Sequence, residues 1–393
     1  MGAGSEAPPL LRTSERNDFK RCPWLWHESW VKGLRTRREP TWAWFGTAIH
    51  RGLEARYPVG DVRGSLGDMI DAFEEALGEQ ERRVYTEGLL VDEEEIVNGR
   101  ELGRAMLRGY VEEYGEDRNW TVLHTEQPFQ IDVPDPIDPS KTLVVYAGTW
   151  DLAIYDNNEH GYGIVDHKTR KSFPKLWNFY NINDQAGSYL WVAKEVLVHK
   201  GILRKKDSIE WLIFNALKKS LPDTRPRNSE GLATNKPKKE HYEAVLRKAG
   251  IEIPKKATIS MMAELAAGGG WEVLGDVSAV QPAELFHREK VWRSPAERVT
   301  QARRVQAEAQ VMAQMRAGTL PLYKTPTEDC TRCPLFEYCE LHEQNPEEAA
   351  EFAAATLVHR DPYRDHREAM AEGGVEIATA TKTKKTRKKA ARG

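Results

Sequence analysis

Long apolar segments are missing from this sequence. No run of apolar residues approaches the roughly 20 that a membrane-spanning helix needs, and the N-terminus lacks the charged-then-apolar layout of a signal peptide. A strong charge of one sign is missing too, since the formal net charge of the 393-residue chain is −3. We therefore expect a cytoplasmic protein without membrane contacts, and only the local distribution of charge can indicate a partner.

Cysteine is scarce, with four residues in the whole chain. Disulfides rarely persist in a reducing cytosol, so these residues need another role. Cys330, Cys333 and Cys339 lie together in CTRCPLFEYC, and Cys22 lies far upstream. Four thiolates suit either a [4Fe–4S] cluster or a structural zinc ion. Either group would close a very long loop and join the N-terminal helix to the C-terminal segment.

Two further patterns are absent. No GxxxxGK[ST] motif occurs, so the chain is not itself a helicase, and no internal repeat is visible. With 40% apolar residues, a chain of this length accommodates two or three domains or one core with insertions. The composition predicts these segments: a disordered start (1–13), a helical part (14–120), a core (121–218), a polar insertion (219–280), a strand, helix and cysteine cluster (281–345), and a tail that is basic at its end (346–393).

The stretch GTWDLAIYDNNEHGYGIVDHKTRK, residues 148–171, predicts two strands joined by a polar turn. Asp151 lies on the first strand, and Asp166 and Lys168 lie two residues apart on the second, hence on one face. Two carboxylates and an ammonium placed in this way can share one hard cation and one reacting phosphate. On its own this trio is a weak signal, because acidic residues flank many hairpins.

Alternating and apolar patterns predict an α/β fold with a central mixed sheet flanked by helices. The expected strands are 120–133, 143–156, 162–168 and 208–218, with a further strand at 285–292. Helical periodicity is expected over 14–34, 66–86, 92–114, 176–199 and 294–316. On the helix 176–199, Gln185 and Tyr189 are four residues apart and therefore project from one face. The alternative for this pair is a helix surface packed under a loop.

A histidine and a glutamate upstream add to these candidates. His50 follows Gly46-Thr47 at what reads as a helix start, and Glu126 lies on the strand before Asp151. A lone histidine is more often a capped core residue than a metal ligand, so the context of His50 decides its interpretation.

Taken together, these motifs resemble the PD-(D/E)XK nuclease superfamily, specifically its RecB-type and CRISPR-adaptation exonuclease branch. The resemblance depends on His50 in GTAIH, Asp151 in GTWD, the VDHKT segment, Gln185-Ala-Gly-Ser-Tyr189 and the four cysteines. Order and spacing match over roughly residues 14–342, apart from the insertion. The resemblance implies a restriction-endonuclease-like core whose N- and C-terminal segments are joined by an iron–sulfur cluster, and it favours this cluster over zinc.

The resemblance also implies a metal site. Asp151, Asp166 and the backbone carbonyl of His167 would offer hard oxygens to Mg²⁺ or Mn²⁺, and His50 would add an imidazole that suits Mn²⁺. Lys168 would orient the attacking water and stabilise the developing charge.

Two further roles follow from the resemblance. Gln185 and Tyr189 would line the DNA path and hold Lys168 or the phosphate. Glu126 is the candidate for an acid that family members often place on the preceding strand.

The implied activity is metal-dependent exonucleolytic cleavage of DNA, with a preference for single-stranded ends. Recombination, repair or phage DNA processing, in a bacterial or phage-infected cell, suits such an enzyme, and unwinding would need a separate helicase or recombination partner. The alternative is a nuclease-silent iron–sulfur subunit that binds DNA within a larger complex, and a third interpretation is a zinc-stapled structural protein. Oligomeric state and polarity of degradation are not encoded in any motif.

Aromatic and basic residues leave two alternatives open. Basic side chains are interleaved with five tryptophans, which either stack on bases of single-stranded DNA or pack around the cluster and the first helix: Trp24, Trp26, Trp30, Trp42 and Trp44. We expect Trp24 and Trp26 to pack. The basic helix 236–248 and the basic tail 382–392 predict only non-specific attraction to phosphates, and a solvated charged face is equally common.

Overall fold

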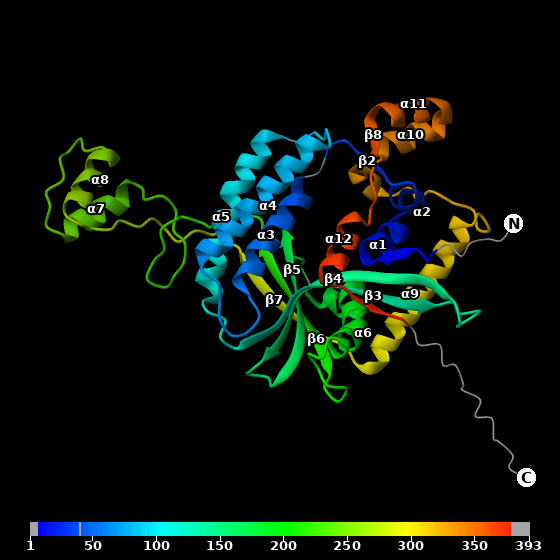
Figure 1. The fold of residues 1–393 in the computed structure, drawn as a ribbon. Helices are drawn as coiled ribbons and strands as arrows, with labels where there is room; N and C mark the ends of the chain where they lie inside the picture. The colour runs from blue at the N-terminus through cyan, green and yellow to red at the C-terminus, as the bar shows by residue number, and fades with distance from the viewer. Residues whose placement is uncertain (1–6, 39–40, 91, 176, 379–393) are drawn as a thin grey trace, which may run out of the picture. The chain divides into compact units, whose positions relative to one another are not determined.

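The computed structural model describes residues 7–38, 41–90, 92–175 and 177–378 (Figure 1). It separates into two compact units, Met1–Lys219 with Phe286–Gly393, and Ser220–Leu285. Among the described residues, no helix is long and apolar enough to cross a membrane.

A mixed sheet forms the centre of the larger unit, as the sequence predicts. Its strand order is β7-β6-β5-β4-β3-β9, with β1 paired to β4. The pairs β3–β4, β4–β5 and β6–β7 are antiparallel, whereas β5–β6, β3–β9 and β1–β4 are parallel. The strands are β1 (Leu10–Arg12), β3 (Trp120–Pro134), β4 (Thr142–Asp156), β5 (Gly161–Arg170), β6 (Ile209–Lys218), β7 (Phe286–Trp292) and β9 (Val375–Ile377).

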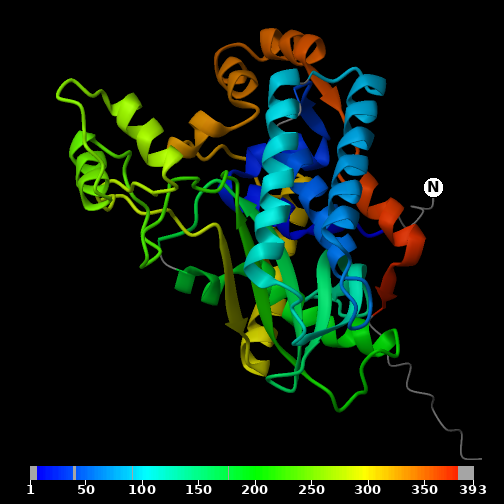
Figure 2. The same cartoon turned by 90° about the vertical axis from the view of Figure 1, so that its left-hand side faces the viewer.

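Helices cover both faces of this sheet. Parallel strands need a crossover, and α6 (Asp184–His199) supplies it between β5 and β6. It packs with α9 (Pro295–Arg316) over a core that includes Trp150 and Phe214. On the other side α3 (Thr41–Arg56), α4 (Leu66–Thr86) and α5 (Glu93–Tyr114) stand side by side (Figure 2). The predicted helix 176–199 differs at its start, where a short 3-10 helix, η2 (Trp177–Ile182), precedes the Asn183 cap of α6.

Local signals explain where the long helices begin. The Ser65 hydroxyl accepts from the Asp68 N–H, and the Asp68 carboxylate accepts from Ser65 in return, which is a capping box. The Asp92 carboxylate caps α5 in a similar way. On α4, Met69 and Phe73 are fully buried, so the apolar spacing marks the face that packs.

The single helix expected over 14–34 is wrong. The structure contains α1 (Thr13–Arg21), α2 (Pro23–Trp26) and a π-helical turn, η1 (His27–Val31), with a break at Cys22. Cys22 is extended at φ −162° because the proline ring that follows disfavours helical backbone at the preceding residue. Cys22 therefore lies at the junction between α1 and α2.

The expectation of disorder over 1–13 and of a tail over 346–393 also needs correction. Leu10–Arg12 pairs with β4 as β1, and residues 1–6 lie outside the described part. After α10 (Phe336–Gln344) come α11 (Pro346–Thr356), β8 (Leu357–His359), α12 (Arg364–Gly373) and β9. These elements are ordered by pairing: β8 with β2 (Leu34–Thr36), and β9 with the edge of β3. The basic stretch 382–392 lies outside the described residues.

The smaller unit, Ser220–Leu285, occupies the polar segment that the sequence placed at 219–280. Its helices α7 (Lys239–Lys248) and α8 (Ile259–Gly268) pack around Leu246 and Met262. It begins and ends at a hairpin of the larger unit, because Leu217 of β6 pairs with Phe286 of β7. The unit is therefore an enlarged hairpin loop with a small core of its own.

Candidate metal centre

Asp151 is the central residue of the site and lies on the β4–β5 hairpin. Leu152 pairs with Val165, so Asp151 and Asp166 are the next residues along the two strands, where the regular ladder ends. Asp151 is buried, and the backbone N–H of His167 donates to its Oδ2. This contact holds the carboxylate where the β4–β5 pairing ends, within β4.

Glu126 reaches the same site from β3. Its neighbours Thr125 and Gln127 pair with Leu152 and Trp150, which puts Glu126 opposite Asp151 on the adjacent strand. Glu126 has φ +42°, a left-handed conformation that costs a non-glycine residue roughly 1–2 kcal/mol. Backbone strain of this kind is concentrated at functional sites, where it directs a side chain.

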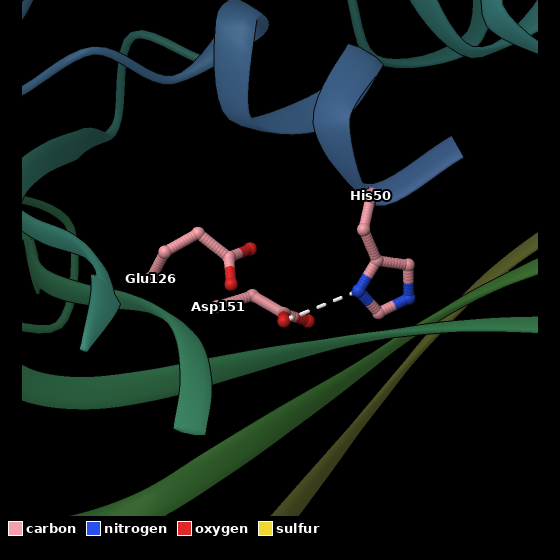
Figure 3. Close-up of side chains that lie close together, drawn as sticks. All are labelled: His50, Glu126 and Asp151. Atoms are coloured by element: carbon pink, nitrogen blue, oxygen red, sulfur yellow. Dashed lines mark ion pairs between the residues drawn. The ribbon is translucent and has the colours of Figure 1, made fainter. Parts of the chain in front are cut away.

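His50 approaches from the helix above the sheet. Its Nδ1 lies 3.2 Å from Asp151 Oδ1. Ligand atoms of His50, Glu126 and Asp151 all lie within 4.8 Å of one another, and Figure 3 shows the three side chains converging. His50 does not lie at a helix start, as the sequence suggested, because α3 already begins at Thr41.

The charges of these three side chains affect one another's pKa. Burial lowers the pKa of His50, but the Asp151 carboxylate raises it to about 9 overall. Burial and then the negative charge of Asp151 raise the pKa of Glu126 to about 8. Burial opposes ionisation of Asp151, yet His50 holds its pKa below the usual range. One imidazole and two carboxylates within 4.8 Å of one another are donors that divalent cations take, so the residues fit such a cation, which would displace the protons of His50 and Glu126.

Asp166 and Lys168 form a second contact beside this group. Lys168 Nζ lies 2.5 Å from Asp166 Oδ2, and the Gln185 amide donates to Asp166 Oδ1 over 3.1 Å. Burial raises the pKa of Asp166. Asp166 is not among the three residues whose ligand atoms lie within 4.8 Å of one another. The structure therefore places this carboxylate against Lys168 and Gln185, next to the His50–Glu126–Asp151 group.

Gln185 and Tyr189 join α6 to the hairpin. The Gln185 amide also donates to the Tyr189 hydroxyl over 2.9 Å, and that hydroxyl donates to the Thr149 carbonyl over 2.5 Å. Tyr189 is buried, with 6% of its surface exposed. The two side chains project from one face, as their spacing predicts, and link Asp166 to the strand that carries Asp151.

One network at the site has no motif in the sequence. The Asn215 amide donates to His167 Nδ1 over 2.8 Å and to the Tyr110 hydroxyl over 2.9 Å. Arg288 Nε donates to Asn215 Oδ1 over 3.3 Å, which fixes the orientation of the amide because arginine has no acceptor. Burial lowers the pKa of His167 to about 3. The available signal was the polar Asn215 within the apolar strand WLIFNAL, since a buried polar residue needs a partner.

The four cysteines meet in the larger unit. Cys22, Cys330, Cys333 and Cys339 line one hollow of about 480 Å³. No three of their sulfur atoms lie within 4.8 Å of one another. The backbone N–H of Thr327 donates to Cys330 Sγ over 3.4 Å. Burial raises the pKa of the Cys333 and Cys339 thiols.

The tryptophans around this region pack inside the protein. Trp24, Trp26 and Trp44 are at most 6% exposed. The Trp26 indole donates to Glu15, and the Trp30 indole donates to Asp18. Packing is therefore the correct alternative for Trp24, Trp26 and Trp44, and the side chain of Trp42 lies outside the described part.

Comparison with protein families agrees with this geometry. The model of the PD-(D/E)XK nuclease superfamily matches residues 13–340. The chain belongs to this superfamily. PD-(D/E)XK nucleases use divalent metals to cut nucleic acid, and the histidine–carboxylate group provides a possible site for one. No curated protein sequence matches the chain.

Proposed function

We propose that the protein is a RecB-type, metal-dependent DNA exonuclease that prefers single-stranded ends and acts in recombination, repair or phage DNA processing. The observation that carries this proposal is the convergence of His50, Glu126 and Asp151 beside the Asp166–Lys168 pair, on adjacent strands of a PD-(D/E)XK core. A silent centre would have no need for a strained glutamate beside an ion pair between the buried Asp166 and the partly exposed Lys168.

His50, Glu126 and Asp151 would hold Mg²⁺ or Mn²⁺, with the His167 backbone carbonyl as a further proposed ligand. Such an ion supplies a Lewis acid for the phosphate and lowers the pKa of bound water. The chain itself fixes the donors: the His167 N–H restrains Asp151, and the φ of +42° directs Glu126. An imidazole in the donor set favours Mn²⁺ over Mg²⁺.

Lys168 would orient the attacking water and stabilise negative charge that develops on the phosphate. Its ammonium is held 2.5 Å from Asp166, whose other oxygen is bound by Gln185. Asp166 would thus act both as part of the acidic site and as the group that positions Lys168. Tyr189, by donating to Thr149, would keep α6 in register with the hairpin.

The four cysteines would hold a [4Fe–4S] cluster. All four line one hollow, and Cys22, in the helix break, lies 308 positions (330 − 22) before the first of the other three. Tetrahedral zinc, with Zn–S distances near 2.3 Å, would bring its sulfurs to about 3.8 Å from one another. No three of the sulfurs lie within 4.8 Å of one another, so the cluster proposal rests on the four cysteines that line one hollow and not on the spacing of their sulfurs.

The cluster proposal is tested by anaerobic purification with iron and zinc analysis. A brown protein with about four iron atoms per chain is expected, and Cys330→Ser should lose the colour. A colourless protein with stoichiometric zinc would show that the cluster assignment is wrong.

The nuclease proposal is tested with end-labelled single- and double-stranded DNA in Mg²⁺, Mn²⁺ or EDTA. Stepwise shortening of the single strand from an end, lost in EDTA, is expected. Products that arise only from internal cuts would contradict the exonuclease assignment. DNA binding without cleavage under any metal would instead favour the alternative of a nuclease-silent subunit.

A further inference from the structure

A second hollow, of about 720 Å³, lies where β5 and β6 end. Four cationic side chains from four separate segments line it: Arg38 after β2, Lys171 after β5, Lys219 after β6, and Arg332 between the cysteines. Among its described lining residues Glu95 is the one acid, and Arg38 and Arg332 also form ion pairs with Asp92 and Asp329 outside the lining, which leaves cations in excess. We call this feature the basic hollow, and its charge favours an anionic ligand.

The parallel pairing of β5 and β6 brings two of these cations together. Arg170 pairs with Lys218, so Lys171 and Lys219 are the next residues along two neighbouring strands. The Lys219 N–H donates to the Arg170 carbonyl over 2.7 Å, which continues the ladder to this point. Burial, and then the positive charge of Lys171, lower the pKa of Lys219 to about 8. A bound anion would relieve the repulsion between the two ammonium groups.

The wall of the basic hollow is apolar. Phe45, Leu102 and Pro334 lie among the cations, and Lys219 Nζ is 5.0 Å from the centroid of the Phe45 ring. Cations beside apolar and aromatic surface are typical of sites that bind single-stranded nucleic acid. The other large hollow, of about 710 Å³, is lined by five arginines and six acidic residues. Its charges cancel, so the basic hollow is the better anion site.

The basic hollow is close to the proposed cleavage centre. Lys171 follows Lys168 by three residues, a separation of at most about 10 Å along an extended chain. An added Cβ on Gly46, the neighbour of Phe45, would lie 3.4 Å from the Thr169 hydroxyl. Helix α3 therefore packs closely against β5 at this point. The separation of about 10 Å between Lys168 and Lys171 corresponds to a few nucleotides, at on the order of 3.4 Å for each nucleotide.

We infer that the basic hollow binds the sugar–phosphate backbone of a single DNA strand a few nucleotides from the scissile phosphate, and that the cysteine loop forms one wall through Arg332 and Pro334. The nature of the ligand rests on the proposed nuclease function. The loop that would hold the cluster would thereby contact the substrate directly.

The test is the salt dependence of binding to a fluorescent single-stranded oligonucleotide in EDTA, where no cleavage occurs. Lys171 and Arg332 are both exposed, so the double variant Lys171→Met/Arg332→Met leaves the core intact. We expect weaker binding and a slope of log K against log [salt] that is less steep by about 1.4, or 0.7 per lost contact. Lys171→Arg/Arg332→Lys should restore the slope.

Lys141→Met is the matched control, because Lys141 is exposed at the far end of the β3–β4 hairpin. An unchanged slope in the double variant would overturn the inference, and so would an equal change in Lys141→Met. Cleavage by the wild-type protein is measured separately. If the wild-type protein cuts DNA and the double variant keeps the wild-type salt slope, the basic hollow is not a DNA subsite, while the proposed nuclease function stands. Binding that depends on these residues without any cleavage refutes the nuclease and supports the subsite.

Discussion

At the scale of single residues, Lys168 is the side chain on which the proposed chemistry depends most directly. Its ammonium is held by Asp166, and Asp166 is held by Gln185. An ammonium that contacts the phosphate only as charge develops contributes to the transition state more than to binding.

Lys168→Ala should therefore lower the rate of cleavage by about 10²–10³-fold, the usual cost of losing one such donor. Binding of single-stranded DNA should change little. Single-turnover cleavage and an EDTA binding assay measure the two quantities, with Lys141→Ala as the control for loss of one positive charge. Full activity in Lys168→Ala would refute the assignment.

Without Glu126, the proposed metal ligands of this group would be only His50 and Asp151. Glu126→Gln keeps the shape of the side chain but removes its charge from the group with His50 and Asp151. We expect the half-saturating concentration of Mn²⁺ to rise by about 10–100-fold, by analogy with losses at metal-site neighbours. Titration of cleavage with Mn²⁺ gives this value. The exposed Glu113→Gln serves as control, and an unaltered Mn²⁺ requirement would exclude Glu126 as a ligand.

At the scale of elements, the β5–β6 pair requires a residue without a side chain at position 163. A Cβ on Gly163 would lie 1.8 Å from the ring of Trp211, which is itself buried. The parallel strands that carry Lys168 and the basic hollow are therefore close only because this position is glycine.

Gly163→Ala should lower the free energy of unfolding by about 1–3 kcal/mol or more, the cost of overpacking a core. Urea denaturation measures it. Gly78→Ala on α4 is the matched control, because its nearest neighbour is the flexible end of Arg82 at 3.4 Å. That helix-interior change should instead stabilise by about 0.5–1 kcal/mol. Equal effects of the two substitutions would contradict the packing argument.

Asp184 connects three helices. Its carboxylate, at the first turn of α6, contacts Lys20 and Arg16 of α1 and Arg304 of α9. Burial raises the pKa of Asp184, but its bonds to Lys20, Arg16 and Gln301 outweigh burial and hold the pKa well below its ordinary value of 3.8. A carboxyl whose pKa is lowered by folding stabilises the folded state above its unfolded-state pKa.

The contribution of Asp184 should accordingly be complete above about pH 4 and disappear as the pH falls below it. Asp184→Asn should cost about 2–3 kcal/mol at pH 7 and less at pH 3. Urea unfolding at both values gives the comparison. As the control, Asp71→Asn at an exposed position should leave the free energy of unfolding unchanged at both pH values. A cost of Asp184→Asn that is the same at pH 7 and pH 3 would exclude an ionic origin.

At the scale of the whole molecule, Ser220–Leu285 is a separable unit inserted in a hairpin. Because Leu217 pairs with Phe286, the two ends of the insertion lie at adjacent positions of the sheet. Its helices have their own buried cluster, which includes Leu246 and Met262.

Replacing 220–285 by Asn-Gly leaves a four-residue loop between Leu217 and Phe286, a common hairpin length. We expect a soluble, cooperatively folding protein that retains metal-dependent cleavage. Circular dichroism melting and the end-labelled DNA assay test this. The same deletion carrying Lys168→Ala should be inactive. Aggregation of the shortened chain would show that the insertion completes the core.

Local patterns in the sequence determined much of this protein. Alternation predicted β3 to β6 within a few residues, because a strand with a buried face records that face at every second position. The capping box of Ser65 and Asp68 at the start of α4 is equally local, since both residues lie within one turn of each other. The order of the motifs was sufficient to indicate the superfamily that the family model then matched.

Tertiary structure alone decided the arrangement of the site. The φ of +42° at Glu126, the contact of Asp166 with Gln185, and the network through Asn215 depend on strand register and on helices distant in the chain. Likewise the segment after the cysteines is ordered by pairing with β2 and β3, elements more than 200 residues away. Sequence periodicity encodes which face of an element is buried, whereas the groups that meet across that face are selected by packing.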